Sequence, residues 1–139
     1  RLDEQGIECL NTLSKSESEY LNSGYSTSLI LSWFIIEHII LDIFLREANG
    51  NMNKNGNSPK FDDMLSKVQS TANYREYSSV IALITQAKNA RNGFAHRNEK
   101  VDKDSAEKSL NAAFALASYK LKIDLKHSIC VPQFLSYAN

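Results

Sequence analysis

Six consecutive residues near the middle of the 139-residue chain, Arg91 to His96 (RNGFAH), carry side chains suited to phosphate chemistry. A histidine has an ordinary pKa of about 6.5, so His96 can take up or release a proton near neutral pH. The guanidinium of Arg91 is permanently charged and can stabilise the negative charge that develops on a phosphorane. Asn92 can donate a hydrogen bond to a phosphate oxygen or orient His96. We therefore take Arg91, Asn92 and His96 as the candidate catalytic residues.

These residues end a stretch, 73–98, whose pattern predicts an amphipathic helix. Its apolar side chains recur at helical spacing, and Arg91 falls at the centre of that core-facing stripe. Asn92 and His96 share the flank of the stripe, with Lys88 one turn earlier. On a regular helix Arg91 and His96 lie about 140° apart, so one chain would not easily aim both at one phosphate. Either Gly93 loosens the helix or a second chain completes the site, and we favour the dimer.

The rest of the chain reads as further helices. The patterns predict helices over residues 3–21, 26–48, 58–69 and 104–126, with no alternation of period two that would indicate a strand. Ser58-Pro59 is expected to begin the third of these, and Asn49-Gly50 to end the second. Asn73 with Glu76, and Asp104 with Glu107, resemble capping boxes. The expected fold class is therefore all-α, an up-and-down bundle of four to five helices.

The 26–48 segment is apolar nearly all round, which is typical of either a central bundle helix or a membrane span. It contains Glu37, His38 and Asp42 within its apolar run, and that run falls short of the ~20 residues a span requires. We expect a core helix and no membrane. A buried Glu37 would then pair with Arg91 and support it, with His38 and Asp42 as a second local pair.

Composition limits the function classes. At 42% hydrophobic and 23% charged residues the chain is expected to form one globular domain, residues 1–139, although it begins without Met and is interpreted as a possible fragment. Sixteen basic residues balance sixteen acidic ones, so any nucleic-acid site must be a local patch. The cysteines Cys9 and Cys130 show no metal or redox spacing and are expected to be free thiols in a reducing cytoplasm. The candidate substrate-binding cations are Lys88, Arg97 and Lys100, with Lys103 beyond them.

The arginine, asparagine and histidine spacing resembles the motif of the HEPN superfamily. That motif is an arginine, usually followed by Asn, Asp or His, with a histidine after four to six intervening residues, and here four residues separate Arg91 from His96. The order of the predicted helices and the acidic Glu37 in the second helix fit the same pattern. The resemblance implies metal-independent RNA cleavage, without a cofactor, in a homodimer whose two motifs form one composite active site.

The resemblance also implies possible biological partners. Some HEPN toxins carry a tyrosine two residues after the histidine, which an antitoxin modifies, but this chain has Asn98 there. An effector of a toxin–antitoxin or phage-defence system, with a separate antitoxin or sensor domain, is the expected role. Two alternatives stay open: a non-catalytic HEPN-like module that binds a nucleotide or a protein, and a purely structural bundle in which Glu37 pairs with Arg91.

Overall fold

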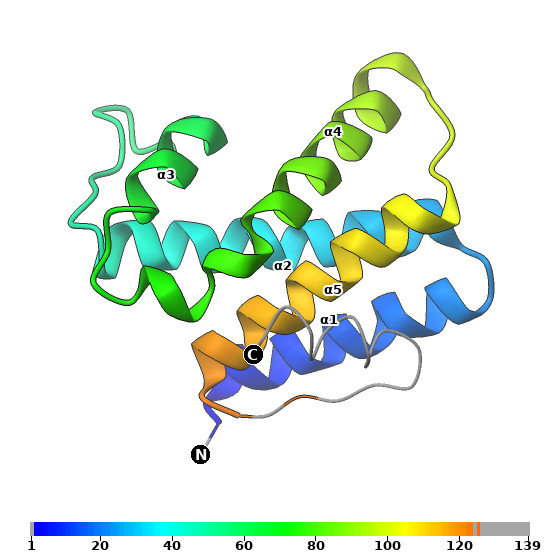
Figure 1. Ribbon diagram of the computed structural model, residues 1–139, viewed down its shortest axis with the longest axis horizontal. Coiled ribbons are helices and arrows are strands. Elements are labelled where there is room, and N and C mark those ends of the chain that lie inside the picture. Colours follow the sequence, from blue (N-terminus) through cyan, green and yellow to red (C-terminus); the bar gives the residue numbers. More distant parts are fainter. Residues whose placement is uncertain (1, 124, 126–139) are drawn as a thin grey trace.

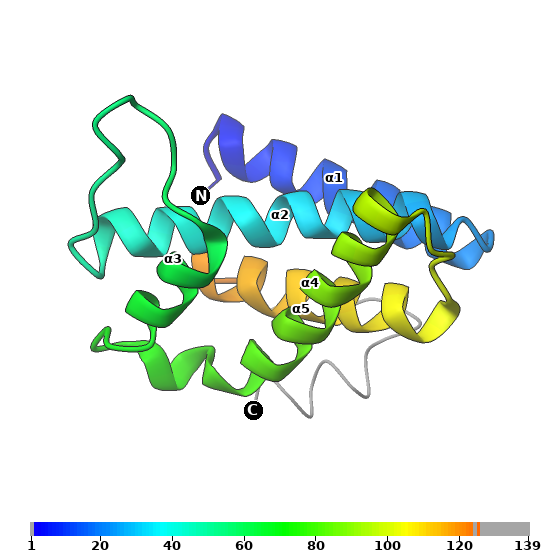
Figure 2. The ribbon, with the colours of Figure 1, turned by 90° about the horizontal axis from the view of Figure 1, so that it is seen from above.

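The computed structural model describes residues 2–123 and 125, which form helices and no strands. Helices α1 and α4 run in one direction and α2 and α5 in the other, while the short α3 lies near the C-terminal end of α2 (Figures 1 and 2). The predicted all-α bundle is confirmed. The five α-helices of the described residues are α1 (Glu4–Leu21), α2 (Tyr25–Arg46), α3 (Phe61–Val68), α4 (Ile81–Arg97) and α5 (Lys103–Leu121).

Helix α2 is the centre of the bundle. The other four α-helices all pack against it, because its apolar side chains surround most of its circumference. By length and composition α2 could cross a membrane, but 56% of its most apolar window is buried inside the protein, as in the core helix of a bundle. Its C-terminal stop follows the prediction: Asn49 has a left-handed φ of 55°, and the N–H of Gly50 donates to the carbonyl of Phe44 at 2.8 Å.

Buried serines allow α1 and α5 to approach α2 closely. The hydroxyls of Ser16 in α1 and Ser28 in α2 each donate to the other residue's carbonyl oxygen at 2.8 Å. Ser32 of α2 and Ser109 of α5 share a hydroxyl–hydroxyl bond of 2.6 Å. All four serines are fully buried, and these bonds satisfy their polar groups. Hydropathy patterns treat serine as a surface residue, so this contact was not predicted.

The predicted starts of α3 and of the motif helix were wrong. Helix α3 begins at Phe61, and neither Ser58 nor Pro59 is part of it. The expected helix 73–98 begins instead with two 3-10 turns, Tyr74–Glu76 and Ser78–Val80, and becomes α-helical only at Ile81. Asn73 makes no capping bond to its own turn, since its side-chain amide donates to a carboxylate oxygen of Glu47 at 3.3 Å. A tertiary hydrogen bond therefore replaces the local cap.

The last helix also differs from its predicted bounds. It begins at Lys103, because Asp102 and not Asp104 is the N-cap and accepts from the Ser105 N–H at 2.8 Å. It ends at Leu121, and Lys122 has a left-handed φ of 58°. The expected end at residue 126 lies outside the described residues, as does Cys130. Cys9 is a free thiol whose pKa is raised by burial.

The position of the α5 cap can be tested by substitution. We expect Asp102→Ala to lower the free energy of unfolding by about 1 kcal/mol, because it leaves an N-terminal N–H of α5 without its acceptor. Asp104→Ala removes only an exposed ion pair with Lys108 and should cost less than about 0.5 kcal/mol. Urea denaturation of both variants measures the difference. Equal losses, or a larger loss for Asp104→Ala, would contradict the assigned cap.

The same cap should make stability depend on pH. The backbone N–H of Ser105 donates to the Asp102 carboxylate and lowers its pKa. A carboxylate whose pKa is lower in the folded state stabilises the protein above its unfolded pKa of about 3.9, and that contribution disappears as the pH falls through the folded pKa. The difference in unfolding free energy between the parent and Asp102→Ala should therefore shrink below pH 4. A difference that stays constant down to pH 2 would show that the charge of Asp102 contributes nothing.

Candidate functional site

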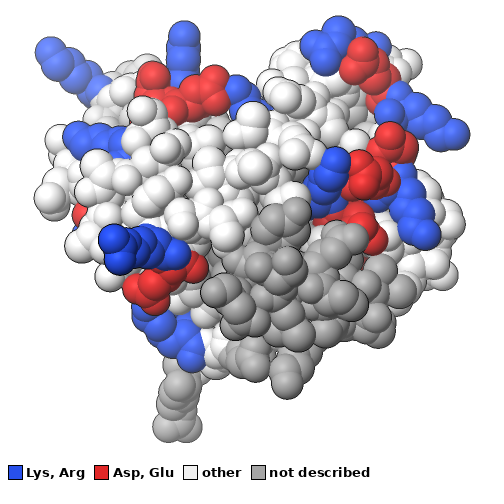
Figure 3. Space-filling view, in the orientation of Figure 1, with Lys and Arg blue, Asp and Glu red and all other residues white. Residues whose placement is uncertain are grey.

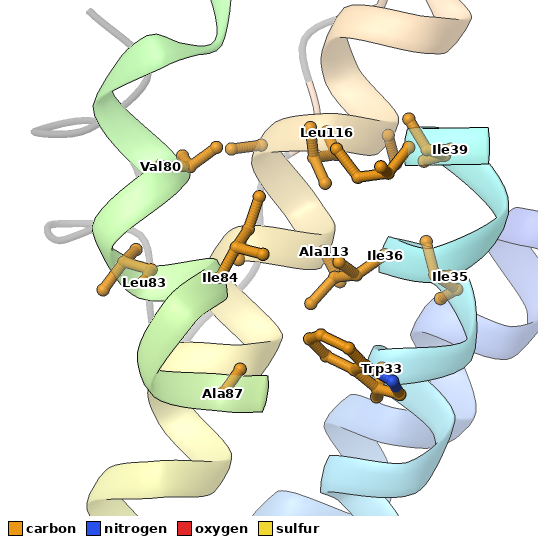
Figure 4. Close-up of a cluster of buried hydrophobic side chains, with 14 of the residues drawn as sticks. Trp33, Ile35, Ile36, Ile39, Val80, Leu83, Ile84, Ala87, Ala113 and Leu116 are labelled. Carbon is orange, nitrogen blue, oxygen red and sulfur yellow. The ribbon is translucent and has the colours of Figure 1, made fainter. Parts of the chain in front are cut away.

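The first half of α4 attaches the candidate site to the core. Leu83, Ile84 and Ala87 are buried and face side chains of α2 and α5, among them Trp33, Ile36 and Ala113 (Figure 4). Towards its C-terminal end α4 diverges from α2 and α5 (Figure 1). Gly93 is the only fully buried residue of its second half, in which Ala90 and Phe94 are partly buried against the core. The residues Arg91 to His96 lie in this second half. The core thus holds the helix, while the two turns that carry the motif remain accessible.

Arg91 continues the core-facing stripe, as predicted, but it is only half-buried. It lies one turn beyond Ala87, which is the last fully buried apolar side chain of α4. Its Nη1 approaches the side-chain oxygen of Asn92 at 3.5 Å, which is the outer limit of a hydrogen bond. Within the described residues Arg91 forms no ion pair. A partly hydrated guanidinium does not need a buried counter-charge.

The expected pair of Glu37 with Arg91 is therefore wrong. Glu37 is half-buried on α2, and across residues 2–123 and 125 no ion pair includes it. The second expected pair is wrong as well. Asp42 binds Arg46 at 2.9 Å and also Lys120, whereas the ring of His38 packs against Phe34 with centroids 4.3 Å apart. The alternative of a purely structural bundle depended on a Glu37–Arg91 ion pair, and the described structure does not contain that pair.

Lys88, Asn92 and His96 form a polar stripe along α4, which we call the motif stripe. Successive members are four residues apart, so each is turned by about 40° from the previous one. Lys88 and Asn92 are half-buried, and His96 is exposed. Lys88 and His96 are about 12 Å apart along the helix axis, so the ammonium group, the amide and the imidazole could contact successive phosphates of one strand.

Gly93 does not loosen the helix, contrary to one of the two possibilities raised by the sequence. Helix α4 continues through it to Arg97, so Arg91 and His96 keep their angular separation of about 140°. Within one chain the guanidinium and the imidazole therefore point to different sides of the helix. The remaining explanation for a shared phosphate is a second chain.

Glu99 occupies the space that Gly93 leaves open. A Cβ on Gly93 would lie 2.2 Å from Oε1 of Glu99, so the carboxylate folds back over the glycine. The fold-back is possible because Asn98 adopts a left-handed φ of 53°, and the N–H of Glu99 donates to the carbonyl of Gly93 at 3.0 Å. Arg97 holds the carboxylate through Nε and Nη2, both at 3.2 Å. Neither the left-handed turn at Asn98 nor the contact of Glu99 with Gly93 was predicted from the sequence.

Two of the three predicted substrate-binding cations are already paired with carboxylates. Lys88 binds Asp62 of α3, and Arg97 binds Glu99. Lys100 is exposed and has no ion pair within the described part of the chain. Figure 3, drawn in the orientation of Figure 1, shows that acidic and basic side chains are mixed on this face of the molecule. Asp62 was missed because no local pattern links two residues 26 positions apart.

A cavity of the described structure lies away from the motif. A cavity of about 680 Å³ is lined by α1, α2 and the end of α5, including Cys9, His38 and Lys120, and no residue of α4 borders it. Among residues 2–123 and 125 no group of three or more His, Cys, Asp or Glu side chains is placed to hold a metal ion.

No protein-family model, curated protein or solved structure matches the chain.

The environment of Arg91 predicts a small effect on stability. Replacing it with alanine leaves no buried charge behind, so Arg91→Ala should change the free energy of unfolding by less than about 1 kcal/mol. Ile84→Ala, at a fully buried position on the same face, should cost about 2–5 kcal/mol and shows that the assay responds. A loss of about 3–5 kcal/mol for Arg91→Ala in chemical denaturation would instead indicate a broken buried ion pair.

Proposed function

We propose that this protein is a metal-independent endoribonuclease of the HEPN type, in which two copies of the chain form one composite site. The observation that supports this most directly is that the motif is accessible and that its arginine forms no ion pair with the described residues. Arg91, Asn92 and His96 lie on the accessible half of α4, and Arg91 has no counter-ion among the described residues. A charged donor without an ion pair is available to an incoming phosphate, and the exposed imidazole on a different side of the same helix is available to a site shared with a second chain.

The proposed chemistry is attack of a ribose 2′-hydroxyl on the adjacent phosphorus. One His96 removes the proton of the 2′-hydroxyl while the new O–P bond forms. The bond to the 5′-oxygen breaks, and a second His96, from the other chain, donates a proton to that oxygen. The products are a 2′,3′-cyclic phosphate and a 5′-hydroxyl. Arg91 stabilises the extra negative charge of the phosphorane, and Asn92 donates to one of its oxygens.

Both copies are needed for a geometric reason. With the motif helix continuous through Gly93, a single chain presents Arg91 and His96 on different sides of α4. A two-fold axis close to the motif stripe would place the Arg91 of one chain beside the His96 of the other. The same arrangement supplies one imidazole as base and one as acid. An effector role in a toxin–antitoxin or phage-defence system is part of the proposal, with single-stranded RNA as substrate.

The activity can be tested with a mixed pool of single-stranded and structured RNA in the presence of a chelator. Parent protein should give cleavage products that end in cyclic phosphate. His96→Ala should reduce the rate by about 100-fold or more, because general acid–base catalysis contributes about 10²–10⁴. His38→Ala, which changes the exposed histidine on α2, is the matched control and should cleave like the parent.

Equal cleavage by the parent and His96→Ala would show that the activity is a contaminant and would exclude His96 as a catalytic residue. Cleavage that disappears with the chelator would exclude the metal-independent mechanism. Nucleotide or RNA binding by the parent without any cleavage would favour the alternative, a non-catalytic binding module.

A further inference from the structure

One member of the motif stripe is held by a residue from another helix. Lys88 begins the stripe that continues through Asn92 to His96, and its ammonium group binds the carboxylate of Asp62 in α3. The lysine side chain is 25% exposed and the aspartate side chain 67% exposed. Asp62 therefore places a negative charge at the solvent-facing start of the stripe that would bind RNA.

The packing of α3 keeps Asp62 in this place. Asp62 lies in the first turn of α3, directly after Phe61, whose ring packs on Trp33 of α2 with centroids 4.9 Å apart. Met64, Leu65 and Val68 are buried against the core. The backbone that carries Asp62 is thus anchored by apolar contacts. Its neighbour Asp63 is exposed and forms no ion pair with the described residues.

A second carboxylate lies near the other end of the stripe. Glu99 covers Gly93 and binds Arg97, and Gly93 is turned by about 60° from His96 on the helix. The charges of Lys88 and Arg97 are therefore balanced locally by Asp62 and Glu99. A phosphate that approaches the stripe has to compete with a carboxylate for each of these cations.

We infer that Asp62 sets the affinity of the site for RNA by holding Lys88 in an ion pair that the RNA phosphate must displace. This inference rests on the proposed function, since it names a control on the same site. Exposed ion pairs contribute little to stability, so a polyanion can displace this one. Removing the negative charge frees the ammonium group for one additional phosphate contact. Each such contact steepens the dependence of the binding constant on salt by about 0.7 for a single strand.

Binding should be measured separately from cleavage. The His96→Ala background prevents turnover, and the probe is a fluorescently labelled single-stranded RNA oligonucleotide followed by anisotropy over a range of salt concentrations. Adding Asp62→Asn should tighten binding about three- to tenfold at low salt and steepen the salt dependence by about 0.7. Asp63→Asn removes the same charge from the neighbouring residue without freeing Lys88. It should raise the logarithm of the binding constant by clearly less than half as much as Asp62→Asn does.

A second comparison assigns the effect to Lys88. The gain from Asp62→Asn should disappear when Lys88→Ala is present as well, whereas a general effect of charge would persist. Thermal unfolding of every variant verifies that α3 remains folded. In the presence of His96, Asp62→Asn should raise kcat/KM by the same factor as the binding constant.

The outcomes separate the two proposals. If the parent cleaves RNA but Asp62→Asn binds no more tightly than Asp63→Asn, the role of Asp62 is refuted and the ribonuclease proposal stands. If Asp62→Asn tightens binding through Lys88 while no variant cleaves, catalysis is refuted and the control by Asp62 stands. If no variant binds the RNA at any salt concentration, both are refuted.

Discussion

The burial of α2 is the constraint on which the rest of the structure depends. An almost uniformly apolar helix has to be covered on every side, and α1, α3, α4 and α5 provide that cover. The serine contacts at Ser16, Ser28, Ser32 and Ser109 let two of these helices approach closely without leaving a polar group unsatisfied. Helix α4 contributes fully buried side chains only as far as Ala87, and beyond it Ala90 and Phe94 are partly buried against the core. The accessible faces of these last turns carry the polar side chains of the motif.

The electrostatics of the motif follow from the same arrangement. Arg91 lies in the less buried half of α4, where it is only half-buried and forms no ion pair with an acidic side chain of the described structure. Lys88, one turn earlier, is close enough to α3 to meet Asp62. Arg97, at the end of the helix, meets Glu99 where the chain turns back over Gly93. Among the described residues the site therefore offers two unpaired cations, Arg91 and Lys100, and two that are available only through competition.

Local patterns predicted the helices well, and tertiary contacts account for most of the errors. The all-α bundle and the central position of 26–48 follow directly from hydrophobic periodicity. The α5 cap was misplaced by two residues because Asp102 and Asp104 are both good capping residues, and only the chain direction before Lys103 distinguishes them. The Glu37–Arg91 pair was predicted from the rule that buried charges need partners, but the departure of α4 from the core cannot be seen in the sequence. Asp62 and Glu99 were missed for the same reason.

The claim that two chains share one active site can be tested most directly by mixing active parent chains with inactive His96→Ala chains at a constant total concentration. After the chains exchange, a mixed dimer holds only one His96, whereas the proposed mechanism needs one imidazole as base and a second as acid. We therefore expect chelator-resistant RNA cleavage to fall with the square of the fraction of parent chains, because only dimers of two parent chains remain active. Cleavage that falls in direct proportion to that fraction, under conditions in which labelled chains form mixed dimers, would contradict the composite site.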